Sequence, residues 1–229
     1  MNIYIGFDFS INKPACTILS DKNIKMFFWP INIQDKLAQT YKDLDINITD
    51  RGLDSVSKDK YDNHELVREH TRRSKELALM ICKDLSDYIK EHIDSHNISD
   101  YNIYIASEGL SFNSKGSSYL DLATYKGVFL DRLSELYDLN NIFTFSPITI
   151  KATAGCNKGD KRGKKDAMIE AFMELEDSLV IKNKFHEALK SGILKNKVNY
   201  KTGVDDLVDS YFCAVTLKNF LEQTQLHKK

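Results

Sequence analysis

Residues 3–8 read Ile-Tyr-Ile-Gly-Phe-Asp, a short apolar run that ends in an acid. A second run of this kind covers residues 101–108 and ends at Glu108. Short apolar runs are typical of buried strands, and the carboxyl ends of strands in α/β proteins form the edge where sites lie. The two runs therefore predict that Asp8 and Glu108 meet at one edge of a sheet.

Two further acids, Asp206 and Asp209, open an apolar segment at residues 207–221 that is predicted to be a helix. Acids three residues apart share one helix face, which suits a single metal centre. Asp205, four residues before Asp209, remains an alternative ligand, and acids at a helix start also favour capping and the helix dipole. Hard divalent cations prefer oxygen ligands, and a two-metal phosphoryl-transfer site needs converging carboxylates. Asp8, Glu108, Asp206 and Asp209 therefore predict a nuclease site that holds two Mg²⁺ or Mn²⁺ ions.

The order of elements predicts the fold class. We expect strands at residues 2–9, 15–20, 25–29, 103–107 and 142–145, and helices at residues 63–96, 116–139, 166–175 and 204–221. Residues 31–62 are polar and weakly periodic, as in an insertion or a long loop. The prediction is one α/β, RNase H-like domain over residues 1–229, with a mixed five-stranded sheet flanked by helices and an insertion at about 31–75.

Positive charge is local in this chain, whose formal net charge is −1. A duplex-binding protein usually carries an overall basic excess, so neutrality argues mildly against nucleic acid. A dense basic stretch with one acid, Asp160, nevertheless lies before the helix predicted at residue 166 and favours phosphate contact, the alternative being a solvated turn. Its basic residues are Lys151, Lys158, Lys161, Arg162, Lys164 and Lys165.

The remaining composition excludes some classes of protein. No apolar run approaches the roughly 18 residues that span a bilayer, and the N-terminus carries no basic-then-apolar signal. The four cysteines are far apart and form no CxxC pair, which favours reduced structural thiols over disulfides or a zinc site. We therefore expect a cytoplasmic protein with no membrane partner, in the host cytoplasm if the protein is viral.

The motifs, taken in order, resemble those of the RuvC-like Holliday-junction resolvases, in a form often encoded by phages and large DNA viruses. The resemblance covers about two-thirds of the chain, and residues 31–75 and 176–202 have no counterpart. The matching segments are the G-x-D-x-S strand at residues 5–10, the acidic strand at 105–108, the helix at 122–127 with Gly127 as the small residue against the sheet, the lysine-rich stretch at Lys151 and 155–168, and the D-x-x-D helix at 206–211.

This resemblance implies a homodimer that resolves a four-way DNA junction by paired nicks at the four acids. A two-fold symmetric enzyme supplies two equivalent sites to a two-fold symmetric junction. Lys165 is expected to act in catalysis, whereas Lys151 and the other basic residues hold DNA phosphates. Phe112, just beyond Glu108, is either core or an aromatic wedge for an opened base step.

Three other functions stay open at this point. The first is another RNase H-like nuclease that cuts flaps, replication forks or RNA–DNA hybrids with the same acids. The second is an actin-like ATPase or kinase, because Gly6-x-Asp8 also opens such chains, although 10 glycines barely supply its two phosphate loops. The third is an inactive DNA-binding scaffold.

Overall fold

A single mixed sheet organises the protein. The computed structural model describes residues 1–52, 63–96, 98–110, 117–157, 166–194 and 202–226. The strands lie in the spatial order β4-β3-β2-β1-β5-β6. Their bounds are β1 Asn2–Asp8, β2 Ala15–Leu19, β3 Ile24–Phe28, β4 Ile46–Ile48, β5 Asn102–Glu108 and β6 Ile142–Phe145.

Strand direction follows from how the strands are connected. β1, β2 and β3 form an antiparallel meander, whereas β5 runs parallel to β1, β6 parallel to β5, and β4 parallel to β3. Only β2 therefore runs against the others in the described sheet. This confirms the predicted α/β fold class with a mixed sheet.

The predicted strand count was wrong by one, because the sheet has six strands. The additional strand, β4, has three residues, of which only Ile46 is fully buried. So short a segment carries no alternating pattern, and pairing with β3 rather than its own sequence makes it a strand.

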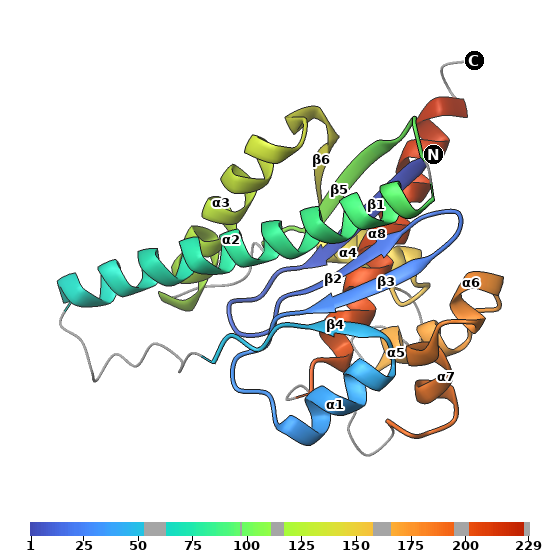
Figure 1. The fold of residues 1–229 in the computed structure, drawn as a ribbon, viewed down its shortest axis with the longest axis horizontal. Coiled ribbons are helices and arrows are strands. Elements are labelled where there is room, and N and C mark those ends of the chain that lie inside the picture. Colours follow the sequence, from blue (N-terminus) through green and yellow to red (C-terminus); the bar gives the residue numbers. More distant parts are fainter. Residues whose placement is uncertain (53–62, 97, 111–116, 158–165, 195–201, 227–229) are drawn as a thin grey trace.

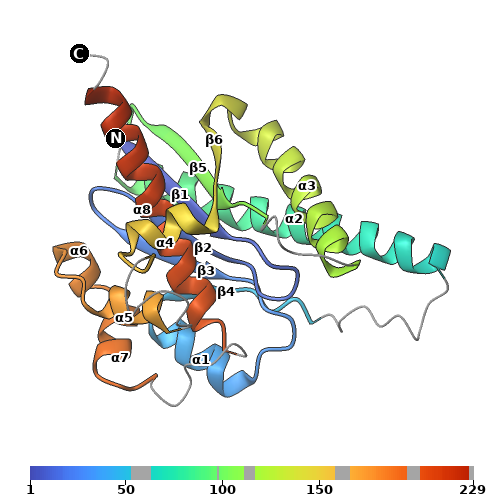
Figure 2. The same cartoon turned by 180° about the vertical axis from the view of Figure 1, so that it is seen from behind.

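Helices cover both faces of the sheet (Figures 1 and 2). α2 (Asn63–Ser95) and α3 (Ser117–Leu136) pack together over one face, and α8 (Val204–Leu226) crosses the other. On the α8 side lie α4 (Pro147–Thr153) and α5 (Ala167–Met173), followed by α6 (Ser178–Ile181) and α7 (Lys184–Lys190). A short 3-10 turn, η2 (Leu139–Asn141), precedes β6.

Side-chain alternation along β1 divides the core into two halves. Ile3, Ile5 and Phe7 belong to the apolar cluster under α2 and α3, whereas Tyr4 belongs to the cluster under α8. Because successive strand residues point to opposite faces, Gly6 and Asp8 lie on the α8 side. The central strand is therefore buried on both faces, and its last residue is presented toward α8.

The segment expected to be an insertion or a long loop is partly regular. It contains α1 (Asp35–Asp43) as well as β4. Leu37 and Tyr41, one helical turn apart, are the buried residues of α1. The Tyr41 hydroxyl donates a 2.7 Å hydrogen bond to the carbonyl oxygen of Thr202, and its ring meets Phe28 edge-on. α1 thus holds the chain just before α8.

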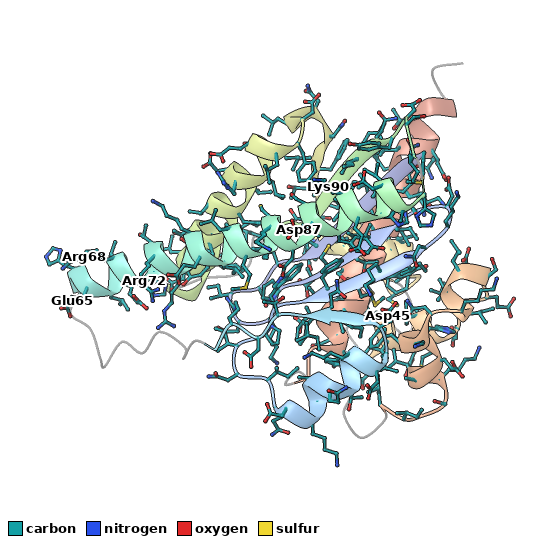
Figure 3. All side chains as sticks on the ribbon, in the orientation of Figure 1. Asp45, Glu65, Arg68, Arg72, Asp87 and Lys90 are labelled. Atoms are coloured by element: carbon teal, nitrogen blue, oxygen red, sulfur yellow. The ribbon has the colours of Figure 1, made fainter. Side chains whose placement is uncertain are left out.

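α2 is one continuous helix, in agreement with the helix predicted at residues 63–96. Its N-terminal part, which carries Glu65, Arg68 and Arg72, extends beyond the sheet (Figure 3). Arg72 forms an ion pair with Glu69 at 2.7 Å and another with Glu76. These residues are three and four positions from Arg72, the spacings at which side chains on a helix surface interact and stabilise the helix. These pairs provide local support for the projecting part of α2.

The cysteines and the hydropathy of the helices bear on two further expectations. All four cysteines are buried free thiols, as predicted. Among the described residues, no helix combines the length and apolar character that crossing a bilayer requires.

Candidate functional site

The first two acids meet because of the register between β1 and β5. Gly6 pairs with Ala106 and Phe7 with Ser107, so that Asp8 and Glu108 end neighbouring parallel strands at the same edge. Both acids are partly buried. Strand alternation directs both toward the face that α8 covers.

α8 carries the other two acids and lies unusually close to β1. A Cβ atom at Gly6 would lie 2.2 Å from the Ala214 amide nitrogen and 2.4 Å from the Ser210 carbonyl oxygen. The Ser210 hydroxyl also forms a 2.8 Å hydrogen bond with the Thr17 hydroxyl of β2, and both residues are fully buried. Glycine at position 6 therefore permits the contact that sets Asp206 and Asp209 beside the strand ends.

Gly127 does not have the role that the sequence suggested. It is exposed on α3, and a Cβ atom there would meet no atom within 4 Å. The glycine that allows a helix to pack closely on the sheet is thus Gly6, which lies on strand β1 and not on a helix.

The four acids form one electrostatic group. Burial raises the pKa of Asp8 well above its usual range, and the charges of Asp206, Asp209 and Glu108 raise it further. Burial likewise raises the pKa of Asp206 to about 7, with a further contribution from Asp205. The Asp8 and Asp206 side chains are hydrogen-bonded to each other, so that a protonated Asp8 donates to the Asp206 carboxylate.

Glu108 and Asp209 complete this group. Burial raises the pKa of Asp209 to about 7, with the charge of Glu108 as the next largest cause. The pKa of Glu108 is also raised by burial, and the positive charges of Lys151 and Lys126 oppose that shift. The site is therefore a set of repelling carboxylates with lysines around it.

Asp206 and Asp205 occupy different positions in this group. Asp206 is the one that contacts Asp8, whereas the Oδ1 atom of Asp205 is buried without a hydrogen-bond partner. Both acids lie in the first turn of α8, directly after Gly203, whose φ of 81° favours glycine. The geometry thus favours Asp206 as the inward-facing acid of the pair and leaves Asp205 beside it.

Among the described residues, three lysines lie near the acids, and two of them were not singled out from the sequence. Lys151 is exposed on α4, and its positive charge opposes the rise in the pKa of Glu108 and Asp209. Lys13, in the loop between β1 and β2, lowers the pKa of Asp206. Lys126 is buried on α3 and interacts with Glu108 and Asp8. The sequence does contain a signal for Lys126. It lies one helical turn from both Leu122 and Phe129, so that a lysine falls on the apolar side of its helix.

α4, which presents Lys151, was also missed. The strand predicted at residues 142–145 is followed by Pro147, which occupies the first turn of this helix. Ser146 caps that helix by accepting a hydrogen bond from the Thr149 amide. The Ser-Pro pair is a recognisable helix start, because proline suits the first turn.

Several predicted residues cannot be placed against this site. Lys158, Lys161, Arg162, Lys164, Lys165 and Phe112 lie outside the described residues. Their proposed roles in DNA binding, and that of Lys165 in catalysis, remain predictions from the sequence.

A divalent cation fits the chemistry of the donor set, although the side chains are not closed around one. Over the described ranges, no group of three or more His, Cys, Asp or Glu side chains is arranged so that it could hold a metal ion as it stands. Burial and mutual repulsion raise the pKa of Asp8, Asp206 and Asp209. Four partly buried carboxylates that repel one another are nevertheless the oxygen ligands that Mg²⁺ and Mn²⁺ prefer.

Comparisons with known proteins gave a family and a similar structure. The structure titled "Thermus thermophilus RuvC structure" is similar at 11% sequence identity and a TM-score of 0.34, covering 85% of this chain and 96% of that one. A search of curated proteins found no match. A family model described as "Lactococcus phage M3 protein" matches residues 58–189, which is more than half of the 229 residues. The chain therefore belongs to the family of the Lactococcus phage M3 protein.

Proposed function

We propose that this protein is a divalent-metal-dependent DNA endonuclease of the RuvC-like type, which resolves four-way junctions. The observation that supports it best is the convergence of Asp8, Glu108, Asp206 and Asp209 from β1, β5 and α8 into one partly buried group. Acids that repel one another lower stability, so a bound cation gives a physical reason for keeping them together.

The four acids would hold two Mg²⁺ or Mn²⁺ ions. Such ions, when bound, lower the pKa of a coordinated water and neutralise charge on the leaving oxygen. Lys151 is exposed beside Glu108 and Asp209, which suits a contact with a DNA phosphate next to the cleaved bond. In this proposal Lys165 assists the reaction, and Phe112 contacts an opened base step.

The junction, the homodimer and the cytoplasmic location rest on the motif resemblance. Paired nicks on a two-fold symmetric junction need two equivalent sites, and a C2 dimer provides them. We also propose that residues 31–75 are an insertion in a single domain, and that α1 within it supports the start of α8 through Tyr41 and Thr202.

Metal dependence is the first expected result. A synthetic four-way junction should be nicked symmetrically in Mg²⁺ or Mn²⁺, because the donor set consists of hard oxygen ligands without a His or Cys cluster. Ca²⁺ should support binding without turnover, and EDTA should stop cleavage. Gel assays on labelled junctions measure this directly.

Matched substrates separate the alternatives. If the protein cuts flaps, forks or RNA–DNA hybrids in preference to junctions of the same sequence, then one of those is its substrate and the junction is not. Undiminished cleavage in EDTA would contradict the two-metal site. ATP hydrolysis without nicking would favour the actin-like alternative.

Salt dependence tests the basic stretch at residues 151–165. Each lost contact to a duplex phosphate should lower the slope of log affinity against log salt by about 0.9. The variant in which Lys158, Lys161, Arg162 and Lys164 are all alanine should therefore bind junctions more weakly, with a slope reduced by up to about 3–4. Fluorescence anisotropy at several salt concentrations measures both quantities.

A second quadruple variant provides the control for charge alone. Lys22, Lys36, Lys75 and Lys90 lie on other parts of the surface, and replacing them removes the same total charge. An equal slope in the wild type and in the first variant would mean that this stretch does not contact phosphates.

A further inference from the structure

Lys126 approaches the acids from the opposite layer of the protein. It lies on α3, which covers the face of the sheet away from α8 (Figures 1 and 2). Its side chain is 5% exposed, and Nζ donates a hydrogen bond to the carbonyl oxygen of Glu108. The ammonium group therefore lies at the strand edge where Asp8 and Glu108 end.

Lys126 lies in a buried part of α3. Tyr125 and Phe129, its neighbours on α3, are fully buried in the cluster under α2 and α3. A buried ammonium group is costly unless it is paired with opposite charge. Burial accordingly lowers the pKa of Lys126, and electrostatic interactions with Cys213, Glu108 and Asp8 oppose this shift and favour the charged form.

Lys126 differs from the other two lysines in its access to solvent. Lys151 is exposed and Lys13 is partly buried, so either can turn to a substrate or to water. The Lys126 ammonium group donates to the Glu108 carbonyl oxygen, and the residue is buried. Its charge therefore belongs to the site whether or not DNA is present.

We propose that Lys126 is a resident cation of the acid group, which partly neutralises the carboxylates without metal and opposes the binding of a divalent ion. This inference rests on the proposed metal site and deepens it. Lys126 is thus a positioning residue, since it acts through Asp8 and Glu108. By holding the Glu108 carbonyl it also fixes the end of β5.

The charge and the hydrogen bond of Lys126 can be separated by substitution. Lys126→Met removes both, while Lys126→Gln removes the charge and keeps a donor for the Glu108 carbonyl. Lys126→Arg retains the charge. Lys90→Met is the control, because Lys90 is exposed on α2 (Figure 3) and removes one charge away from the acids.

Removal of a fixed positive charge near the ligands should tighten Mn²⁺ binding. Both Lys126→Met and Lys126→Gln should bind Mn²⁺ about tenfold more tightly or better, because the carboxylates lose a competing cation. Lys126→Arg and Lys90→Met should bind as the wild type does. Isothermal titration calorimetry and Mn²⁺ electron paramagnetic resonance on the full chain measure this without any cleavage.

Stability provides a second readout with a distinct pattern. Without metal, Lys126→Met and Lys126→Gln should unfold at a lower temperature than the wild type, and saturating Mn²⁺ should raise that temperature more than in the wild type. If Lys126→Met does not fold, Lys126→Gln still decides the question.

A purely structural role predicts the opposite sign. If Lys126 only ties β5 to α3, its loss distorts the site, so that Lys126→Met binds Mn²⁺ more weakly and Lys126→Gln resembles the wild type. Either result overturns the inference. Absence of Mn²⁺ binding by the wild type would instead overturn the proposed metal site.

Discussion

Asp8→Asn is expected to abolish cleavage and, at the same time, to stabilise the metal-free protein. Burial and the charges of Asp206, Asp209 and Glu108 raise the pKa of Asp8 well above its usual range, and its protonated form can donate to Asp206. An asparagine amide can make the same donation without ever becoming charged. At pH 8 the free energy of unfolding of the metal-free variant should exceed that of the wild type by about 1–3 kcal/mol. For a chain of this size this corresponds to a rise of roughly 2–12 °C in unfolding temperature.

The pH dependence of this gain fixes its cause. The folded-state pKa of Asp206 and Asp209 is about 7, above the unfolded value of about 3.9. Carboxyl groups with a raised folded-state pKa contribute to the free energy of unfolding in full below pH 4, and this contribution is lost as the pH rises through 7. Metal-free wild type should therefore weaken between pH 4 and 8, and Asp8→Asn should weaken less.

Calorimetry in EDTA checks this prediction, with Asp131→Asn as the control at an exposed position of α3. Mg²⁺ should raise the unfolding temperature of the wild type and of the control but hardly that of Asp8→Asn. A metal-free Asp8→Asn protein no more stable than the wild type at pH 8 would show that the acids do not repel one another as the structure indicates.

Gly6→Ala is the second large effect that we expect. The added Cβ would lie within 2.2–2.4 Å of main-chain atoms of Ser210 and Ala214, which no rotamer change can relieve. α8 must then move away from β1, at a cost of about 3 kcal/mol or more. The movement also separates Asp206 and Asp209 from Asp8, so metal binding and cleavage should both be lost.

Gly127→Ala is the matched control, because a Cβ atom there meets nothing. Alanine is favoured over glycine inside a helix, so this variant should be up to about 1 kcal/mol more stable and fully active. Chemical denaturation measures both variants. Normal stability of Gly6→Ala would mean that α8 does not lie as close to the sheet as described.

Much of the fold was predictable because its elements have strong local patterns. β1 and β5 are continuous apolar runs, and the apolar residues of α2 recur at helical spacing. α1 and β4 were missed because their order depends on partners outside their own segments, since Tyr41 of α1 contacts Thr202 and β4 pairs with β3. Local sequence does not encode such a partner.

The acids of the site were easier to predict than its lysines. Asp8 and Glu108 end strands, and α/β topology brings such residues to one edge without further information. Lys126 lies on a helix of the other layer, and only the packing of α3 against the sheet brings its head group to Glu108. The interpretation of Gly127 failed for a similar reason, since the helix face that meets the sheet depends on packing.

The hydrogen bond between Thr17 and Ser210 also bears on when the site can form during synthesis. It joins residues 193 positions apart, and α8 supplies two of the four acids. Contacts of such long sequence separation form late, because the loop between them must first be closed. A nascent chain that ends before Val204 contains the six described strands but only two of the four acids. The proposed nuclease should therefore be inactive during synthesis until α8 has emerged and docked against the sheet.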